Sequence, residues 1–292
     1  MKRLAVIHAS AVAALLLSLA ACQPARPGAE DAATAELRAK GYARAPEITS
    51  VVEEGTTFVV YGVANKGGRV NLKYLGANDA GLTLNASIGG EVDKEGVFRI
   101  PEVPVGPHGG LYDLLATDSP RSQRESEVPA DTSAFPTDLP SDERGRWLHA
   151  EGKLFVPRGH PEKAVVLRAG VAGRPVSVQN QIIAEVDYDG RGGIAVAGRV
   201  APDITVNLVV GGVMIGRSQS DADGRYQVLG QISAPGEAEV VMDIEITTEK
   251  QSQTRAVPIS LPPGGDRITP IEGGWRVDWG LPGGGVQTSV VF

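Results

Sequence analysis

Two acidic turns contain the side chains best suited to binding a metal ion. Asp221 and Asp223 lie in one turn, and Asp93 and Glu95 lie at matching places in the other. Carboxylate oxygens are good ligands for Ca²⁺, but this ion takes about six to eight oxygens, and no complete calcium loop follows either turn. We therefore predict polar hairpin turns and no metal site, with Asp221 and Asp223 as the alternative calcium ligands.

The histidines give little support for catalysis. His8 lies in the apolar N-terminal segment, and His108, His149 and His160 follow no zinc-binding spacing. The chain also lacks the Gly-x-Ser-x-Gly sequence of a nucleophile elbow, although a Ser/His/Asp triad dispersed along the sequence stays open. We predict no catalytic residue, no cofactor and no enzymatic activity.

A tryptophan-rich segment near the end of the chain is the candidate binding site. Trp275, Arg276, Asp278 and Trp279 lie within five residues, and strand alternation puts both tryptophans on one face. Exposed tryptophans could stack on sugar rings or anchor a protein partner. The alternative is that both rings cover the end of a β-sandwich, which is the commoner fate of large aromatic side chains.

Cys22 is the only cysteine, so the chain forms no intramolecular disulfide. It follows a basic start and an apolar run that together are typical of a secretory signal peptide. The ending Leu19-Ala20-Ala21-Cys22 resembles the lipobox of bacterial lipoproteins. The resemblance implies cleavage after residue 21, lipidation of Cys22 and anchoring without a membrane span. Since Gln23 and not Asp follows the cysteine, it further implies the outer membrane, on its periplasmic or surface face.

The composition favours short strands. The chain has 37 Gly and 20 Pro, and only 5% of its residues are aromatic. Its 28 Lys and Arg against 35 Asp and Glu give a net charge of −7, which excludes the basic footprint of a nucleic-acid-binding protein. No later stretch reaches the roughly 18 apolar residues of a membrane-spanning helix.

An internal repeat organises the region after residue 46, where the pattern changes to alternating strands. Residues 62–72 align with 198–208, and residues 93–98 align with 221–226. The offset between aligned positions is smaller at the second match than at the first. The first copy therefore contains extra residues between the two matches, and we place them within 76–83. A repeat at this distance indicates two copies of one domain and not a solenoid.

The shared pattern is a Gly before Val-x-Leu, followed by an Asp-x-Asp/Glu-Gly turn and an aromatic residue. It is similar to bacterial immunoglobulin-like (Ig-like) repeats of surface and adhesion proteins. The resemblance implies an all-β fold with two Ig-like antiparallel β-sandwich domains, to which we add a C-terminal β-hairpin.

The predicted organisation has five parts. They are a lipoprotein signal peptide (1–21), a lipid anchor and tether (22–46), a first sandwich (47–176) with a polar loop (118–146), a second sandwich (177–262) and a tryptophan hairpin (263–292). We predict a lipid-anchored cell-envelope protein with a structural, spacer, adhesion or assembly role. Its partners would be the membrane and envelope proteins or glycans. The alternative is a glycan- or peptidoglycan-binding module that uses the Trp275/Trp279 hairpin.

Overall fold

The computed structural model describes residues 45–75, 87–117, 147–177 and 180–292. Apart from one short 3-10 helix, Pro161–Lys163, the regular structure of these residues consists of β-strands in antiparallel sheets. The all-β fold class is confirmed. The signal peptide, Cys22, the tether up to residue 44, the extra residues 76–83 and the polar loop up to residue 146 lie outside the described residues.

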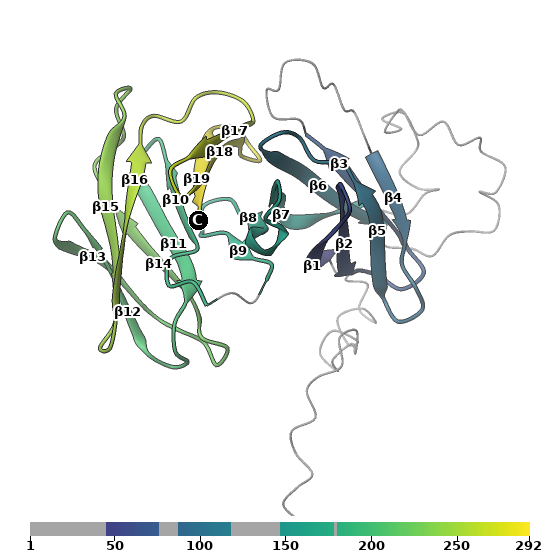
Figure 1. Cartoon of the computed structure of the whole chain (residues 1–292), viewed down its shortest axis with the longest axis horizontal. Coiled ribbons are helices and arrows are strands. Elements are labelled where there is room, and N and C mark those ends of the chain that lie inside the picture. The colour runs from purple at the N-terminus through teal and green to yellow at the C-terminus, as the bar shows by residue number, and fades with distance from the viewer. Residues whose placement is uncertain (1–44, 76–86, 118–146, 178–179) are drawn as a thin grey trace, which may run out of the picture.

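The first half of the chain forms a sandwich of two sheets (Figure 1). One sheet has the order β1-β2-β5 and the other the order β4-β3-β6-β7-β8-β9. The strands are β1 (Glu47–Glu54), β2 (Thr57–Val63), β3 (Arg69–Tyr74), β4 (Ser87–Glu91), β5 (Val97–Val103), β6 (Gly109–Thr117), β7 (Trp147–Pro157), β8 (Val165–Leu167) and β9 (Arg174–Pro175).

The second half forms another sandwich, with the sheets β14-β11-β10-β19-β18-β17 and β13-β12-β15-β16. Its strands are β10 (Glu185–Asp189), β11 (Gly193–Arg199), β12 (Thr205–Val210), β13 (Val213–Gln219), β14 (Arg225–Gln231), β15 (Val240–Thr247), β16 (Ser252–Ile259), β17 (Arg267–Ile271), β18 (Gly274–Gly280) and β19 (Val286–Val291).

The two sandwiches share one topology. Strands β1 to β7 pair in the orders 1-2-5 and 4-3-6-7, and strands β10 to β16 repeat both orders. This is the arrangement of an Ig-like sandwich, and it matches the repeat in the sequence. The β3–β4 connection spans residues 75–86, whereas only Gly211 and Gly212 join β12 to β13. The first copy is therefore longer at the place that the alignment indicates.

The repeated glycine is required by close backbone packing. A Cβ atom on Gly62 would overlap the carbonyl oxygen of Glu47, and one on Gly198 would overlap that of Ile182. In both copies, the segment entering the sandwich passes directly over this position. Only glycine leaves enough space there.

Each sandwich has its own apolar core. Side chains such as Val60, Leu72 and Phe98 fill the first, and Val196, Leu208 and Ile246 fill the second. Strict alternation of buried and less buried residues is clearest in β3 and β12, as expected when one face of a sheet is buried.

The C-terminal hairpin is not a separate unit, in contrast to the prediction for residues 263–292. Strand β19 pairs with β10 from Glu185↔Val291 to Asp189↔Gln287, so β17, β18 and β19 widen one sheet of the second sandwich. The hairpin alternates in sequence as predicted, but its pairing with a strand about a hundred residues earlier is a long-range contact that local patterns do not reveal.

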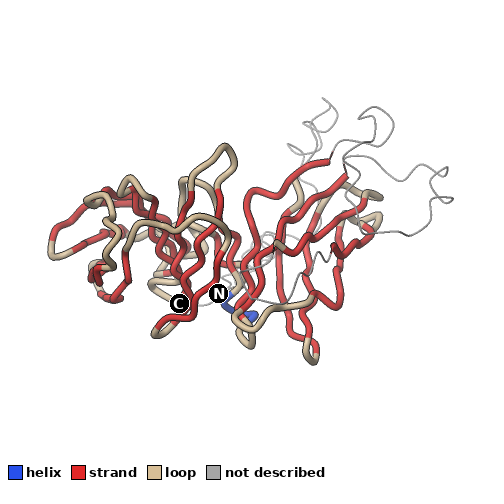
Figure 2. The backbone as a smooth tube through the Cα atoms, turned by 90° about the horizontal axis from the view of Figure 1, so that it is seen from above, coloured by secondary structure: helices blue, strands red, loops and turns tan. Residues whose placement is uncertain are grey.

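A third apolar core joins the two sandwiches. The outer faces of β6, β7 and β8 pack against the outer faces of β17, β18 and β19, so four sheets follow one another across the molecule. In Figure 2 the two sandwiches lie side by side, with the short helix at their junction. The buried side chains of this junction core are Leu111, Phe155, Val165 and Leu167 from the first sandwich and Ile268, Val277, Trp279 and Val291 from the second.

Trp279 is the largest side chain of the junction core and is only 1% exposed. We expect Trp279→Ala to lower the free energy of unfolding by about 3–5 kcal/mol, because it leaves a large cavity between the sandwiches. Trp147→Ala is the matched control, since Trp147 is 41% exposed at the start of β7 and should cost about 1 kcal/mol or less. Urea unfolding followed by far-UV circular dichroism measures both. An equal loss of unfolding free energy in the two variants would contradict the burial of Trp279 in the junction core.

Candidate functional site

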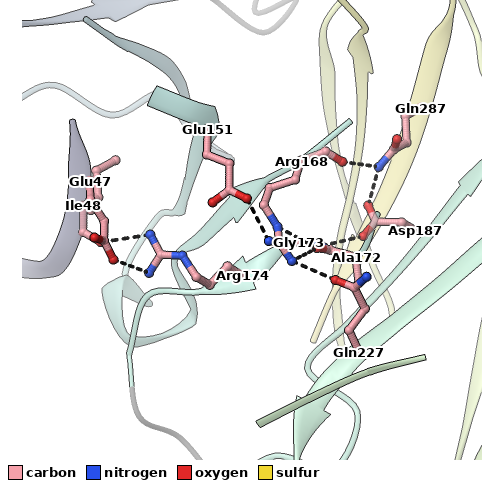
Figure 3. A network of polar contacts seen from close by, with 10 residues as sticks. All are labelled: Glu47, Ile48, Glu151, Arg168, Ala172, Gly173, Arg174, Asp187, Gln227 and Gln287. Atoms are coloured by element: carbon pink, nitrogen blue, oxygen red, sulfur yellow. Dashed lines mark hydrogen bonds and ion pairs between the residues drawn. The ribbon is translucent and has the colours of Figure 1, made fainter. Parts of the chain in front are cut away.

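The loop between β8 and β9 connects the two sandwiches through polar contacts (Figure 3). Arg168 donates from Nε and Nη2 to the carbonyl oxygen of Ala172, at 2.9 and 2.7 Å, which closes the loop on itself. Its Nη2 also donates to Oε1 of Gln227 on β14 at 2.8 Å, and its Nη1 pairs with Glu151 at 3.0 Å. One guanidinium group thus fixes the loop to both halves of the molecule.

Gln287 on β19 forms hydrogen bonds with the backbone of the same loop. Its amide nitrogen donates to the carbonyl oxygen of Arg168 at 3.1 Å, and its amide oxygen accepts from the N–H of Gly170 at 3.0 Å. The amide nitrogen also donates to Oδ1 of Asp187 at 3.0 Å. The other Asp187 oxygen accepts from the N–H of Gly173 at 2.9 Å, so both ends of the loop are anchored on the second sandwich.

Arg174 extends this network to the first strand of the chain. Its Nη2 donates to the carbonyl oxygen of Ile48 at 3.2 Å, and its Nη1 lies 3.8 Å from Glu47. Figure 3 shows the resulting series of contacts from β1 through the loop to β10 and β19.

A fully buried carboxyl group lies in the middle of this junction. Glu185 is 0% exposed, and neither of its carboxyl oxygens has a hydrogen-bond partner among the described residues. Burial raises its pKa well above the ordinary value, and the Asp187 carboxylate adds to the rise, while Arg168 opposes it. Glu185 is therefore protonated at pH values where an exposed glutamate is ionised.

The pKa of Asp187 is also raised by this environment, but less than that of Glu185. Burial raises its pKa to about 6, against the hydrogen bonds that it accepts from Ser289, Gly173 and Gln287. The two carboxyl groups face a protein interface from adjacent outward positions on β10. Both carboxyl groups are buried against another part of the chain, whereas an acid–base pair would face a space that a substrate can enter.

The tryptophan face predicted to bind a ligand is turned toward the first sandwich. Trp279 is buried in the junction core and donates from Nε1 to Ser289 at 3.1 Å. Lys153 of the first sandwich lies 5.6 Å from the centre of its ring. Trp275 is half-buried at the rim, where its ring centre lies 5.4 Å from that of His160 and 5.3 Å from the Lys163 ammonium.

Arg276 and Asp278 point to the opposite side of the hairpin and are buried there. Arg276 donates from Nε to Asp278 at 3.1 Å and from Nη1 to the hydroxyl of Ser260 at 2.8 Å. The four residues thus do not form one open ligand-binding face. The tryptophan rings pack against the first sandwich at the junction core. This placement is nearer to the alternative, in which both rings cover the end of a sandwich.

The acidic turns use their carboxylates to hold the backbone. Asp221 Oδ1 accepts from the N–H groups of Asp223 and Arg225, at 2.9 and 2.8 Å. Asp93 makes the same two bonds in the first copy, to Glu95 and Val97. Asp223 is exposed and lies 3.6 Å from Arg225. No group of three possible ligands gathers around a metal position in the described ranges.

The candidate histidines are all on the surface of the described structure. His108 and His149 are exposed, and His160 is exposed beside Glu162, at 3.1 Å. The structure also has no helix, within the described residues, of the length and apolarity needed for a membrane span.

A cavity of about 680 Å³ opens beside the junction, between the two sandwiches. Its walls come from the short helix and β9 on one side, and from β11, β14 and the end of β19 on the other. Sequence reasoning missed this cavity and the Glu185/Asp187 pair. The available signal was Glu185-Val-Asp187, which places two acidic residues on one face of a strand next to apolar runs.

The chain has little detectable similarity to known proteins. No protein-family model matches the chain, and no curated protein matches its sequence. Among solved structures, a chain entitled "Biofilm associated protein - BSP domain" matches at 12% identity with a TM-score of 0.22. The match covers 75% of this chain and 30% of that chain, so this chain spans less than a third of its length. At this TM-score the match shows neither a shared fold nor a shared role.

The buried Glu185 predicts a specific dependence of stability on pH. The folded state keeps this group protonated, whereas the unfolded state ionises it above its ordinary pKa of 4.5. The group's contribution to stability is therefore complete below pH 4.5 and is lost as the pH rises through the higher pKa of the folded state. Glu185→Gln removes this dependence and should stabilise the protein at pH 7.5 by on the order of 1 kcal/mol or more.

Urea unfolding of wild type and Glu185→Gln at pH 4, 6 and 7.5 measures this effect, and their difference should shrink toward pH 4. Glu53→Gln is the control, because Glu53 is exposed on β1. A variant less stable than wild type at pH 7.5 would show that Glu185 has a partner and is ionised.

Proposed function

We propose that this chain is a lipid-anchored cell-envelope protein whose two sandwiches act together as one structural element. The observation that supports this most directly is the junction core, in which an apolar face of the first sandwich is covered by the C-terminal hairpin. Two domains joined only by a linker would move independently. Two domains that share a buried core keep a fixed spacing, as a spacer or assembly element requires.

The anchoring part of the proposal depends on the lipobox-like sequence Leu19-Ala20-Ala21-Cys22. A lipid on Cys22 would hold the sandwiches near a membrane, and the Ala- and Pro-rich residues up to 46 would separate them from it. We place the protein at the outer membrane. We propose adhesion or assembly and not catalysis, because the buried acidic pair contacts another part of the same chain.

Cys22→Ala tests the anchor. In a Gram-negative host grown with an alkyne-labelled fatty acid, the unaltered chain should carry the label and sediment with the outer-membrane fraction. Cys22→Ala should lose the label and leave that fraction, because a lipid at this residue is the proposed attachment. Ser18→Ala, which keeps the four-residue motif, should retain both properties. Membrane retention of an unlabelled Cys22→Ala protein would contradict the anchor.

Spin-label distances test whether the sandwiches act as one element. With Cys22→Ala as background, labels at Glu53→Cys on β1 and Arg217→Cys on β13 report on different sandwiches, and both positions are exposed. The distance distribution should be narrow and should broaden with Trp279→Ala, because that change removes the centre of the junction core.

A label pair within the second sandwich, Arg217→Cys with Glu249→Cys, is the control and should stay narrow in both backgrounds. A broad distribution between the two sandwiches in the unaltered junction would overturn the proposed structural role. It would leave the lipid anchor untouched, so the two parts of the proposal fail separately.

A further inference from the structure

The cavity beside the junction combines walls from both sandwiches. The first sandwich contributes residues from the short helix to Ser177, and the second contributes residues around Gly198, Ser220 and Tyr226. Its volume of about 680 Å³ lies within the range of small-molecule binding sites.

The charge of the lining is opposite in sign to that of the chain. Five cationic side chains line the cavity against three acidic ones, in a protein with a net charge of −7. The cations are Lys163, Arg168 and Arg174 from the first sandwich and Arg199 and Arg225 from the second; the acids are Glu162, Asp203 and Asp221. A concave, positively charged site in an acidic protein focuses the field on anionic ligands.

These cations have two different roles. Arg168 and Arg174 are held by the loop, by Gln227 and by the first strand, so their positions are fixed by protein contacts. Arg199 and Lys163 form no ion pair with any acidic side chain of the described residues, and both are half-buried. Arg225 is exposed, and its one ion pair within the described part of the chain is with the exposed Asp223, at 3.6 Å.

Cationic side chains without acidic partners are available to form charge-assisted hydrogen bonds with an anionic ligand. Lys163 has a partial compensation in the Trp275 ring, 5.3 Å away. The described structure places no aromatic ring or acidic side chain against the Arg199 guanidinium in this way. The planar guanidinium group can form two parallel hydrogen bonds with a carboxylate or phosphate.

We propose that this cavity binds a small polyanion with at least two carboxylate or phosphate groups. One group would bind Arg199 and Arg225 of the second sandwich, and the other would bind Lys163 of the first. The ligand would thus bridge the two sandwiches. The junction core holds both walls in place beforehand, which lowers the cost of ordering the site on binding.

The experiment is isothermal titration calorimetry of the full chain in detergent micelles at 50 mM salt. Citrate is the carboxylate probe, inorganic pyrophosphate the phosphate probe and maltose the neutral probe. At least one anion should bind with a submillimolar dissociation constant that weakens as salt is raised. Binding of only one anion would identify the recognised group.

Arg199→Gln and Arg225→Gln should each weaken binding about tenfold, because each removes a charge-assisted hydrogen bond. Lys163→Gln on the opposite wall should also weaken it. The matched control is Arg191→Gln, since Arg191 is exposed and does not line the cavity. Circular dichroism confirms that each variant is folded before titration.

Three results would overturn the proposal. They are the absence of binding by both anions at 10 mM, equal binding of maltose and the anions, and unchanged affinity in the folded Arg199→Gln/Arg225→Gln double variant. None of these results depends on the lipid anchor. The cavity needs both sandwiches, so the inference rests on the fixed junction of the proposed function. A narrow spin-label distance between the sandwiches together with any of these three results would overturn the inference and leave the proposed function standing.

Discussion

The burial of one apolar sheet face determines how the rest of this molecule is assembled. In an isolated sandwich, the outer faces of β6, β7 and β8 would expose Leu111, Phe155 and Leu167 to water. The C-terminal hairpin covers them, because β19 joins the second sandwich beside β10 and turns Val277 and Trp279 outward. Apolar burial of this kind is the main favourable term in domain association. The loop contacts, the buried acids and the cavity all exist because the two sheets meet there.

The junction also contains groups that oppose its formation. The Glu185 carboxyl group is buried and has no hydrogen-bond partner among the described residues. The Asp187 carboxylate accepts its hydrogen bonds from the loop and from its neighbours on β19. Such groups are costly to desolvate, so the apolar contacts must outweigh them. In return, the Asp187 and Gln287 contacts specify one position for the β8–β9 loop, since a slip of one residue would leave these buried groups unpaired. The polar contacts thus select the alignment, while the apolar core supplies the stability.

Local features of this fold could be predicted from the sequence, and long-range ones could not. Alternating residues marked most strands, and the repeat around Gly62 and Gly198 marked two sandwiches of one topology. The Asp93 and Asp221 turns followed from turn chemistry. The junction was missed because it joins residues about a hundred positions apart. Local traces of it are the run 111–116 in β6 and the strand β19, in which nearly every residue is buried, as expected for strands covered on both faces.

The two tryptophans show why an aromatic-rich segment is ambiguous in a sequence. Aromatic residues beside charged ones are typical of exposed recognition surfaces and equally of interfaces within a chain. What distinguishes the two is the partner, and here the partner is the first sandwich. Once that contact forms, Lys163, Arg199 and Arg225 are brought to the walls of a single cavity. Charges from the two sandwiches then meet in one site, which neither sandwich could provide alone. A site of this kind can arise only in the joined pair, and it does so through the contact that makes the pair one structural element.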